Sequence, residues 1–325
     1  MKIAVLGAGA IGAYVGAALA RGGADVHVVA RGEHLAAMQR HGIRVLSSRG
    51  DFVASPPATD DPSNIGPVDV VFLGLKANSY ATAGPLLDPL MHEDTAVVAA
   101  QNGIPWWYFH GIDGPYSGRR IEAVDPDGTV TRVISPSRAI GCVVYAGTEL
   151  EAPGVVRHLE GTRFTIGEPD ESLSERCKLF SEAMVAGGLK CPVETTALRN
   201  EVWVKLMGNV AFNPLSALTR ATIAGMCRYE PTRDLVAAMM HETVDVARAV
   251  GAEPHISVEK RLEGGHKVGE HRTSTLLDLE AGKPLELAPI INAVVELADL
   301  TGVPAPSMRA VAAATGLLAE TLSLN

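Results

Sequence analysis

Lys2-Ile-Ala-Val-Leu-Gly-Ala-Gly-Ala-Ile-Gly12 decides the fold of this chain, because a short apolar strand runs directly into Gly-x-Gly-x-x-Gly. An apolar helix is predicted next, over Ile11–Ala20, and a second strand over Asp25–Ala30. The glycine spacing alone is common, but this strand–helix–strand order is typical of a nucleotide-binding unit. The first thirty residues therefore predict a dinucleotide site.

The glycines have separate physical roles in such a unit. Gly7 permits a tight turn, Gly9 lets the backbone approach a pyrophosphate, and Gly12 lets the helix lie close to the strand. The N–H groups and the dipole at the start of the helix then attract the phosphate charge. The predicted pyrophosphate-binding residues are Gly7, Ala8, Gly9, Ala10, Ile11 and Gly12.

The same stretch has a competing interpretation. Lys2 followed by an apolar run to Arg21 resembles a secretory signal, and Gly12-x-x-x-Gly16 is a spacing found in membrane helix dimers. Four glycines interrupt the run, however, and the second strand follows at once. We therefore favour the nucleotide-binding interpretation.

The end of the second strand predicts which dinucleotide is bound. An NAD site usually places an acidic residue there to bind the ribose 2′-hydroxyl. This chain has Arg31 instead, and a guanidinium can bind a 2′-phosphate with two hydrogen bonds. The predicted cofactor is NADP(H); the alternative is that Arg31 is a solvated loop residue.

Length and charge limit the possible functions. With 325 residues the chain is long enough for two domains, and 47% hydrophobic residues supply an ample core. The net charge of −9, without a run of Lys or Arg, argues against nucleic acid and against acidic membrane surfaces as partners. An anionic substrate remains possible, because it needs only a local positive site.

Cysteine and histidine spacing predicts neither disulfides nor a metal site. The four cysteines are widely spaced, which fits a reducing compartment, and we expect a cytoplasmic protein. His266 and His271 are five residues apart with His255 nearby, a spacing that does not place metal ligands on one helix face. No metal is predicted.

Strand and helix patterns alternate in the first part of the chain and helices dominate from about Thr196. We predict an NADP-binding domain over residues 1–195 and a helical substrate and catalytic domain over 196–325. The predicted strands are Lys2–Leu6, Asp25–Ala30, Val68–Gly74, Thr95–Ala100, Arg138–Tyr145, Gly154–His158, Arg163–Ile166 and one at Val193. The long predicted helices are Asn200–Leu215, Thr232–Val250 and Leu285–Thr301.

Residues 104–137 form a long polar stretch that carries Trp106, Trp107, Tyr108, Phe109 and Tyr116. Long irregular segments in compact domains are often functional. We interpret this one as a lid or a pocket wall. The alternative is an aromatic cluster that packs beneath its own loop.

One predicted helix carries a candidate catalytic group. Lys205, Asn209 and Asn213 are spaced by four residues, which places them on one face. Apolar residues surround them, so a lysine and two amides line up beside a buried surface. A lysine in such a place is a candidate proton donor.

Taken together, these features resemble the ketopantoate reductase family, the NADPH-dependent 2-dehydropantoate 2-reductases, over essentially the whole chain. The segment around Lys205 is the specific one, whereas the glycine motif is shared with many oxidoreductases. The matching segments are Lys2–Gly12, Leu75-Lys76-Ala77, Gln101-Asn102-Gly103, Glu201–Ala217, Thr273–Asp278, Glu286 and Gly302-Val-Pro304.

The resemblance implies roles for residues of the helical part. Lys205 would donate the proton to the oxygen of the reduced carbonyl, and Glu286 would orient the substrate hydroxyl or the cofactor. Asn209, Asn213 and Ser274 would bind the carboxylate and the hydroxyl of the substrate. The substrate would be a small 2-oxo acid, with 2-dehydropantoate as the best single choice and pantothenate biosynthesis as the pathway.

The resemblance also implies a fold and further cofactor contacts. The fold is an α/β, Rossmann-type doubly wound sheet followed by an all-α domain like the C-terminal domain of 6-phosphogluconate dehydrogenase. Asn102 would lie between nicotinamide and substrate, contacting both, and Arg31 and Lys76 would face the adenosine end of NADPH. The apolar helices could also pair two copies into a homodimer.

The chain departs from the family pattern after Glu286, where an acid and an aromatic residue are replaced by Ala288 and Pro289. Proline is tolerated only in the first turn of a helix, so a helix is expected to start near Ala288. These changes leave open a different 2-oxo acid as substrate. An opine or 3-hydroxy acid dehydrogenase and a non-catalytic NADP sensor also remain open.

Overall fold

A computed structural model describes residues 1–324, which form two compact units. Unit 1 contains residues 1–101, 107–119 and 128–198, and unit 2 contains 102–106, 120–127 and the chain from Arg199 onward. The sequence had placed both short segments in the first domain. They cluster with unit 2 because their backbone N–H groups bond to it: Ile104 donates to the Pro289 carbonyl, and Glu122 and Ala123 donate to the Glu296 carboxylate.

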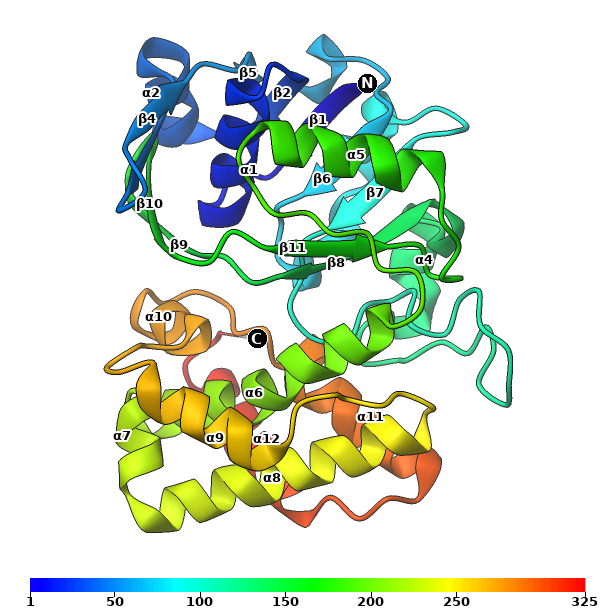
Figure 1. The fold of residues 1–325 in the computed structure, drawn as a ribbon, viewed down its shortest axis with the longest axis vertical. Coiled ribbons are helices and arrows are strands. Elements are labelled where there is room, and N and C mark those ends of the chain that lie inside the picture. The colour runs from blue at the N-terminus through cyan, green and yellow to red at the C-terminus, as the bar shows by residue number, and fades with distance from the viewer. Residues whose placement is uncertain (325) are drawn as a thin grey trace. The chain divides into compact units, whose positions relative to one another are not determined.

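Unit 1 is built on a seven-stranded sheet. Its strands are β1 (Lys2–Leu6), β2 (Asp25–Val29), β5 (Ala58–Thr59), β6 (Val70–Leu73), β7 (Ala96–Ala99), β8 (Ala139–Val144) and β11 (Phe164–Gly167). Their order is β11-β8-β7-β6-β1-β2-β5, and every neighbouring pair is parallel except β8 with β11 (Figure 1). From β5 to β8 this is the 3-2-1-4-5-6 order of a Rossmann-type sheet, which confirms the predicted fold class of this part.

A second, four-stranded sheet was not predicted. It has the order β4-β3-β10-β9, with β3 (Ile43–Ser47), β4 (Phe52–Ala54), β9 (Gly147–Ala152) and β10 (Val155–Glu160). Only the region of β10 had been identified as a strand. β9 has no buried residue and its last three residues, Leu150 to Ala152, are exposed, so its extended form depends on pairing with β10 rather than on an apolar pattern.

Helix α1 (Ala10–Arg21) contacts both sheets: β1 and β2 of the first, and β3, β4, β9 and β10 of the second (Figure 1). Every residue from Gly12 to Leu19 is consequently buried. A helix that is covered on all sides is apolar on all sides. This explains why the segment resembles a secretory signal or a membrane span. Within residues 1–324, the structure has no helix that is long and apolar enough to cross a bilayer.

The part of the aromatic segment that belongs to unit 1, residues 107–119, packs within that unit rather than standing open as a lid. Trp107, Tyr108 and Phe109 are at most 2% exposed, and the rings of Phe109 and Tyr116 lie 5.5 Å apart between centroids. Trp107 covers Gly141 of β8 so closely that a Cβ there would lie 2.5 Å from the ring. These contacts support the alternative of a packed aromatic cluster.

The remaining helices of unit 1 are α2 (Gly32–His41), α3 (Gly84–Leu87), α4 (Thr129–Val133) and α5 (Glu175–Ala186). From Leu198 to residue 324 the regular structure is helical, as predicted, with α6 (Leu198–Thr219), α7 (Ile223–Arg228), α8 (Glu230–Ala249), α9 (Val258–Lys267), α10 (Ser274–Glu280), α11 (Ala293–Thr301) and α12 (Pro306–Thr321). The predicted helix over Leu285–Thr301 is divided: a π-helical turn over Ala288–Asn292 precedes α11. Its start agrees with the one expected from Pro289.

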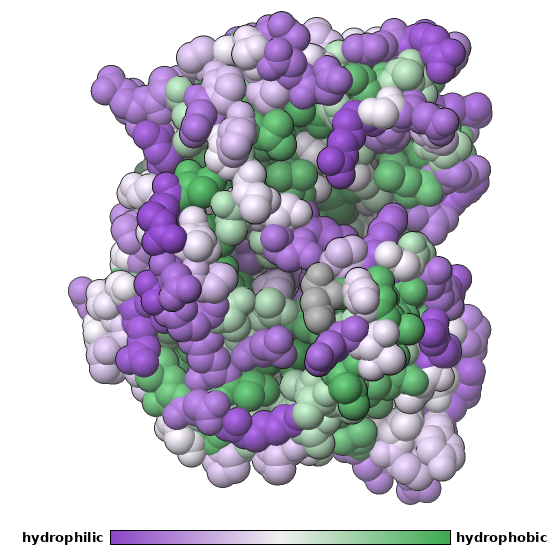
Figure 2. Space-filling model, turned by 180° about the vertical axis from the view of Figure 1, so that it is seen from behind, coloured by the Kyte–Doolittle hydropathy of each residue, from purple (hydrophilic) through white to green (hydrophobic). Residues whose placement is uncertain are grey.

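The surface is mixed in character. On the face drawn in Figure 2, hydrophilic residues in purple lie beside hydrophobic residues in green. More than half of the surface of a folded protein normally comes from apolar atoms, so such a mixture does not by itself mark a binding surface.

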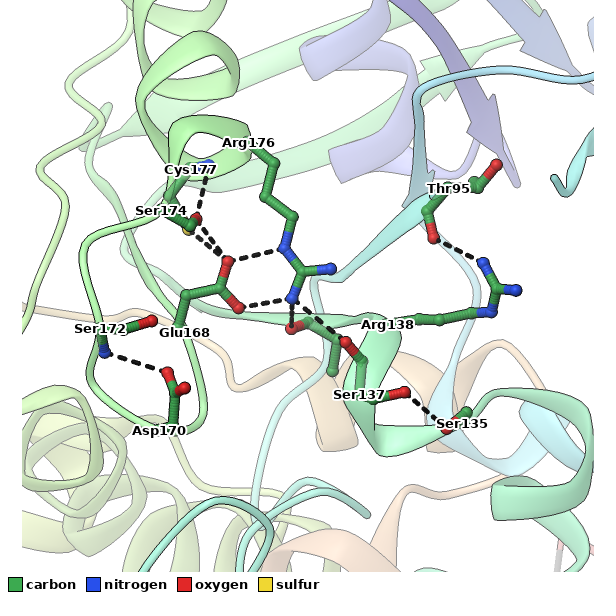
Figure 3. A network of polar contacts seen from close by, with 11 residues as sticks. Thr95, Ser135, Ser137, Arg138, Glu168, Asp170, Ser172, Ser174, Arg176 and Cys177 are labelled. Carbon is green, nitrogen blue, oxygen red and sulfur yellow. Dashed lines mark hydrogen bonds and ion pairs between the residues drawn. The ribbon is translucent and has the colours of Figure 1, made fainter. Parts of the chain in front are cut away.

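An ion pair between the buried Glu168 carboxylate and the half-buried Arg176 joins α5 to the sheet of unit 1 (Figure 3). The Glu168 carboxylate, directly after β11, accepts hydrogen bonds from Arg176 at 2.6 and 2.5 Å and from the Ser174 hydroxyl at 2.5 Å. Arg176 also donates to the carbonyls of Ser137 and Ala139 at the start of β8. The hydrogen bonds that Arg176 donates to Glu168 raise the pKa of Arg176, so the guanidinium stays charged.

We predict that Arg176→Met lowers the free energy of unfolding by about 3–5 kcal/mol, because it leaves a buried carboxylate without its cation. The Glu168 side chain is only 5% exposed, so bulk water solvates its carboxylate poorly. Urea unfolding measures the loss. Lys178→Met is the matched control on α5, where an exposed pair is worth less than about 1 kcal/mol.

The double variant Glu168→Gln with Arg176→Met tests the cause. An amide is less costly to bury than an unpaired carboxylate, so the double variant recovers part of the stability. If the single and the double variant were equally unstable, the buried charge would not be the reason.

Candidate functional site

The glycine-rich turn between β1 and α1 is closed by backbone contacts. Gly7 has φ of 93°, and its N–H donates to the Val29 carbonyl at 3.2 Å. A Cβ on Gly12 would lie 2.0 Å from the Gly7 oxygen, and one on Gly74 would lie 2.2 Å from the same atom. Any side chain at Gly12 or Gly74 would therefore force the turn open. The packing of unit 1 itself requires Gly7 and Gly12.

Gly9 has a different explanation. A Cβ there would meet only the Gly74 oxygen, at an ordinary 3.7 Å, so packing within the protein does not require a glycine. Gly9 is the N-cap of α1; no side chain caps this helix, and its first turn holds no acidic residue. The space above Gly9 and the backbone N–H groups of Ala10 and Ile11 suit an anion. These residues fit the pyrophosphate of a dinucleotide.

Arg31 and Lys76 lie at the same edge of the sheet as this turn. Arg31 is exposed and is the N-cap of α2, two residues after β2, and the half-buried Lys76 lies three residues after β6. Because β2 and β6 are the two neighbours of β1, their carboxyl ends flank the glycine turn. The Leu75 side chain packs against the glycine turn, since a Cβ on Gly7 would lie 2.6 Å from it.

His34 is a residue of this site that the sequence analysis missed. Its Nε2 lies 2.8 Å from the carbonyl oxygen of Ala8, in the middle of the glycine turn. Its Nδ1 accepts the N–H of Gly154 at 2.9 Å. No periodicity or spacing could reveal it, because Gly154 lies 120 residues away along the chain.

In unit 2, α6 carries the predicted row of polar side chains. The helix is continuous from Leu198 to Thr219, so Lys205, Asn209 and Asn213 lie on one face. Burial increases along the row: Lys205 and Asn209 are half-buried, and Asn213 is 6% exposed. Pro214 lies inside the helix and removes the backbone donor after Asn213.

Asn102 meets Lys205 directly. The Lys205 ammonium donates to the Asn102 Oδ1 at 2.8 Å, although the two residues are 103 positions apart. Lysine has only donors, so the amide oxygen of Asn102 must face it, and the amide NH2 is left to serve another acceptor.

A π-helical turn fixes the segment that carries Asn102. Ile104 donates its N–H to the Pro289 carbonyl at 2.8 Å. Gly103 has φ of 84°, and a Cβ there would lie 2.0 Å from the same carbonyl oxygen. Glu286 lies two residues before this turn and is 8% exposed. The turn that follows Glu286 therefore also positions the partner of Lys205.

Ser274 is connected to the Asn213 end of α6 through hydroxyl groups. The Ser216 hydroxyl donates to the Asn213 carbonyl at 2.8 Å and also contacts the Thr273 hydroxyl. Because the Ser216 proton is already used, Thr273 donates to Ser216. Thr273 is the N-cap of α10, and the exposed Ser274 is the first residue of that helix.

Cysteine and metal chemistry have little support within residues 1–324. The four cysteines are free and buried, and burial raises the pKa of Cys177 to about 12, so this thiol stays protonated. The described residues contain no group of three His, Cys, Asp or Glu side chains placed to hold a metal ion.

Comparison with known proteins gives consistent matches. Residues 3–109 match the family model described as ketopantoate reductase PanE/ApbA, and residues 197–319 match the model of its C-terminal part. A 2-dehydropantoate 2-reductase from Mesorhizobium japonicum is 46% identical over 320 residues, covering 98% of both chains.

Solved structures give the same picture. The 2-dehydropantoate 2-reductase from Geobacter metallireducens GS-15 has a TM-score of 0.85 at 29% identity, covering 98% of this chain and 100% of that one. A D-mandelate dehydrogenase with NADH and anilino(oxo)acetate has a TM-score of 0.82 over 100% of both chains. Its identity of 19% establishes a shared fold alone.

We predict that Gly103→Ala lowers the free energy of unfolding by at least about 2 kcal/mol, because the methyl group strains the backbone and collides with the Pro289 carbonyl. Urea unfolding provides the measurement. Gly316→Ala is the control in α12, where a Cβ meets nothing within 4 Å, and it should stabilise by up to about 1 kcal/mol. Unchanged stability of Gly103→Ala would show that this contact is not tight.

Proposed function

The chain belongs to the ketopantoate reductase PanE/ApbA family, and on that basis we propose that it reduces 2-dehydropantoate to pantoate with NADPH. Family membership makes it an oxidoreductase that acts on a CH–OH group and implies a nicotinamide cofactor. The observation that carries the proposal is the 2.8 Å hydrogen bond from the Lys205 ammonium to Asn102, two residues of the segments by which the chain resembles the family.

Lys205 is the proposed proton donor. When bound, the nicotinamide supplies a hydride to the carbonyl carbon of the 2-oxo acid, and negative charge then develops on the carbonyl oxygen. The Lys205 ammonium stabilises that oxygen and transfers a proton to it. The Asn102 Oδ1 accepts a hydrogen bond from the ammonium group and so restrains the orientation of that group.

The remaining polar residues of unit 2 are proposed to hold the substrate. Asn209 and Asn213 follow Lys205 at one-turn intervals and offer amide donors to a carboxylate. Ser274, connected to α6 through Thr273 and Ser216, offers a hydroxyl. Glu286 would accept a hydrogen bond from the substrate hydroxyl or the cofactor.

NADPH rather than NADH is proposed as the reductant. Arg31 and Lys76 supply positive charge on both sides of the glycine turn, and the residues from Val29 to Arg31 at the end of β2 include no carboxylate to bind a ribose 2′-hydroxyl. A guanidinium suits the 2′-phosphate that distinguishes the two cofactors.

A different 2-oxo acid is a second candidate substrate. Ala288 and Pro289 replace the polar and aromatic residues expected after Glu286, which alters the surroundings of a proposed substrate residue. An opine enzyme and a sensor are less favoured, because a paired lysine and amide serve a proton transfer to a carbonyl.

Location and assembly are part of the proposal. The four free cysteines fit a reducing compartment, and we propose a cytoplasmic enzyme of pantothenate biosynthesis. We also propose a homodimer formed through unit 2, where Tyr229 and Leu317 are each 65% exposed.

A panel of 2-oxo acids tests the activity through the fall in NADPH absorbance. We predict the highest kcat/KM with 2-dehydropantoate, and a Lys205→Ala variant whose turnover is at least about a hundredfold lower, with NADPH binding intact, because the proton donor is lost. Lys260→Ala, an exposed lysine of α9, is the control with normal turnover.

Other results of these assays would change the assigned function. Near-normal turnover of Lys205→Ala would exclude the assigned role. Faster reduction of a larger 2-oxo acid would change the substrate, oxidation of NADPH only with an added amine would indicate an opine enzyme, and no oxidation at all would favour the sensor.

Arg31→Ala tests the cofactor. We predict that the KM for NADPH rises about tenfold or more, because hydrogen bonds to a charged group are lost, whereas kcat/KM with NADH changes little. Arg40→Ala, at the other end of α2, is the matched control. An equal loss with both cofactors would mean that Arg31 does not contact the 2′-phosphate.

A further inference from the structure

His34 uses both of its ring nitrogens to connect distant parts of unit 1. The ring extends from the first turn of α2, and its Nε2 meets the Ala8 carbonyl at 2.8 Å. Its Nδ1 faces the N–H of Gly154, in the turn between β9 and β10, at 2.9 Å. The glycine turn of the first sheet and a hairpin of the second sheet are therefore attached to one imidazole.

The two partners define the protonation state of the ring. A backbone N–H can only donate, so Nδ1 must accept from Gly154 and carry no proton. A carbonyl can only accept, so Nε2 must carry the proton that is donated to Ala8. This is the neutral Nε2–H tautomer. Burial lowers the pKa of His34, which favours the neutral ring, although the bond to Ala8 acts in the opposite direction.

Gly154 is itself held firmly. Its carbonyl accepts the Arg44 N–H of β3 at 2.9 Å, and its φ is 74°. A Cβ on Gly154 would lie 3.0 Å from the Cβ of Ala37, so the hairpin turn packs against α2. Because the Gly154 N–H is fixed, it fixes the plane of the imidazole, and the opposite nitrogen is aimed at Ala8.

The bond to Ala8 determines which way the next amide points. In a planar trans peptide the carbonyl of one residue and the N–H of the following residue point in opposite directions. Holding the Ala8 oxygen toward His34 therefore turns the Gly9 N–H away from it. Rotation of this peptide changes ψ of Ala8 and φ of Gly9, and Gly9 has no side chain to resist it. A rotated peptide would present an oxygen, not an N–H, to an anion.

We propose that His34 is a positioning residue that keeps the Ala8–Gly9 peptide turned so that the Gly9 N–H faces the cofactor pyrophosphate. The proposal rests on the proposed dinucleotide binding at this turn. It assigns the recognition of the pyrophosphate partly to a residue outside the glycine motif. It also gives the second sheet a role in cofactor binding, since Gly154 orients the ring.

Three substitutions separate the two hydrogen bonds. His34→Gln keeps an N–H donor near the place of Nε2 and loses the acceptor for Gly154. His34→Asn keeps an acceptor near the place of Nδ1 and is too short to reach Ala8. His34→Ala loses both. His41→Ala, at the exposed C-terminal end of α2, is the control.

The dissociation constant of NADPH is measured with the full chain by isothermal titration, beside KM and kcat. We expect His34→Ala and His34→Asn to raise the dissociation constant and KM about tenfold, the equivalent of one hydrogen bond. His34→Gln should retain most of the affinity. The kcat at saturating NADPH should stay within about twofold in all three, because no reacting group is touched.

Adenosine 2′-monophosphate distinguishes positioning from general damage. It carries the adenosine and the 2′-phosphate but no pyrophosphate, so its affinity should be the same in wild type and variants. Equal weakening of both ligands, or unchanged NADPH affinity in His34→Ala, would overturn the proposal. If His34→Ala does not fold, the Gln and Asn variants decide: equal NADPH affinity in the two would also overturn it.

Failure of the proposed function gives a different result. A wild-type chain that does not bind NADPH would contradict the assigned function itself. A wild type that binds NADPH, with variants that bind it equally well, would contradict only the role of His34.

Discussion

The absence of a side chain at Gly12 is the constraint on which the structure depends. A single methyl group there would lie 2.0 Å from the Gly7 oxygen, and Gly74 approaches the same atom from the neighbouring strand. Because Gly12 and Gly74 carry a hydrogen in place of a side chain, α1 can lie close to β1 and fill the space between the two sheets of unit 1. The same glycine turn that lets α1 pack on β1 also presents the N-terminus of α1 to an anion.

Local patterns predicted what local physics determines. The strand over Lys2–Leu6 and its glycine turn were placed correctly, because burial on both faces and a positive φ leave clear traces in sequence. The second sheet was missed because β9 is a strand only through its partner β10. The sequence leaves the aromatic segment open between a lid or pocket wall and a packed cluster, since composition cannot distinguish side chains that cover a pocket from side chains that fill a core.

The residues of the candidate site also differ in how far local sequence patterns predict them. The row from Lys205 to Asn213 follows from helical periodicity alone, whereas Asn102 was connected to it only by family resemblance. Neither helical periodicity nor family resemblance pointed to His34, because its two partners are backbone groups 26 and 120 residues away. Contacts made by backbone atoms leave no residue-type pattern, so tertiary structure is needed to find them.

Pro289 shows how a departure from the family pattern can leave the core of the site in place. Its contribution to the Asn102 segment is a backbone carbonyl, which accepts the Ile104 N–H at 2.8 Å and touches Gly103. A residue of any type supplies that oxygen, provided that the π-helical turn is kept, and proline is compatible with the start of such a turn. The side chain at this position can therefore differ from the family pattern while the pairing of Asn102 with Lys205 persists.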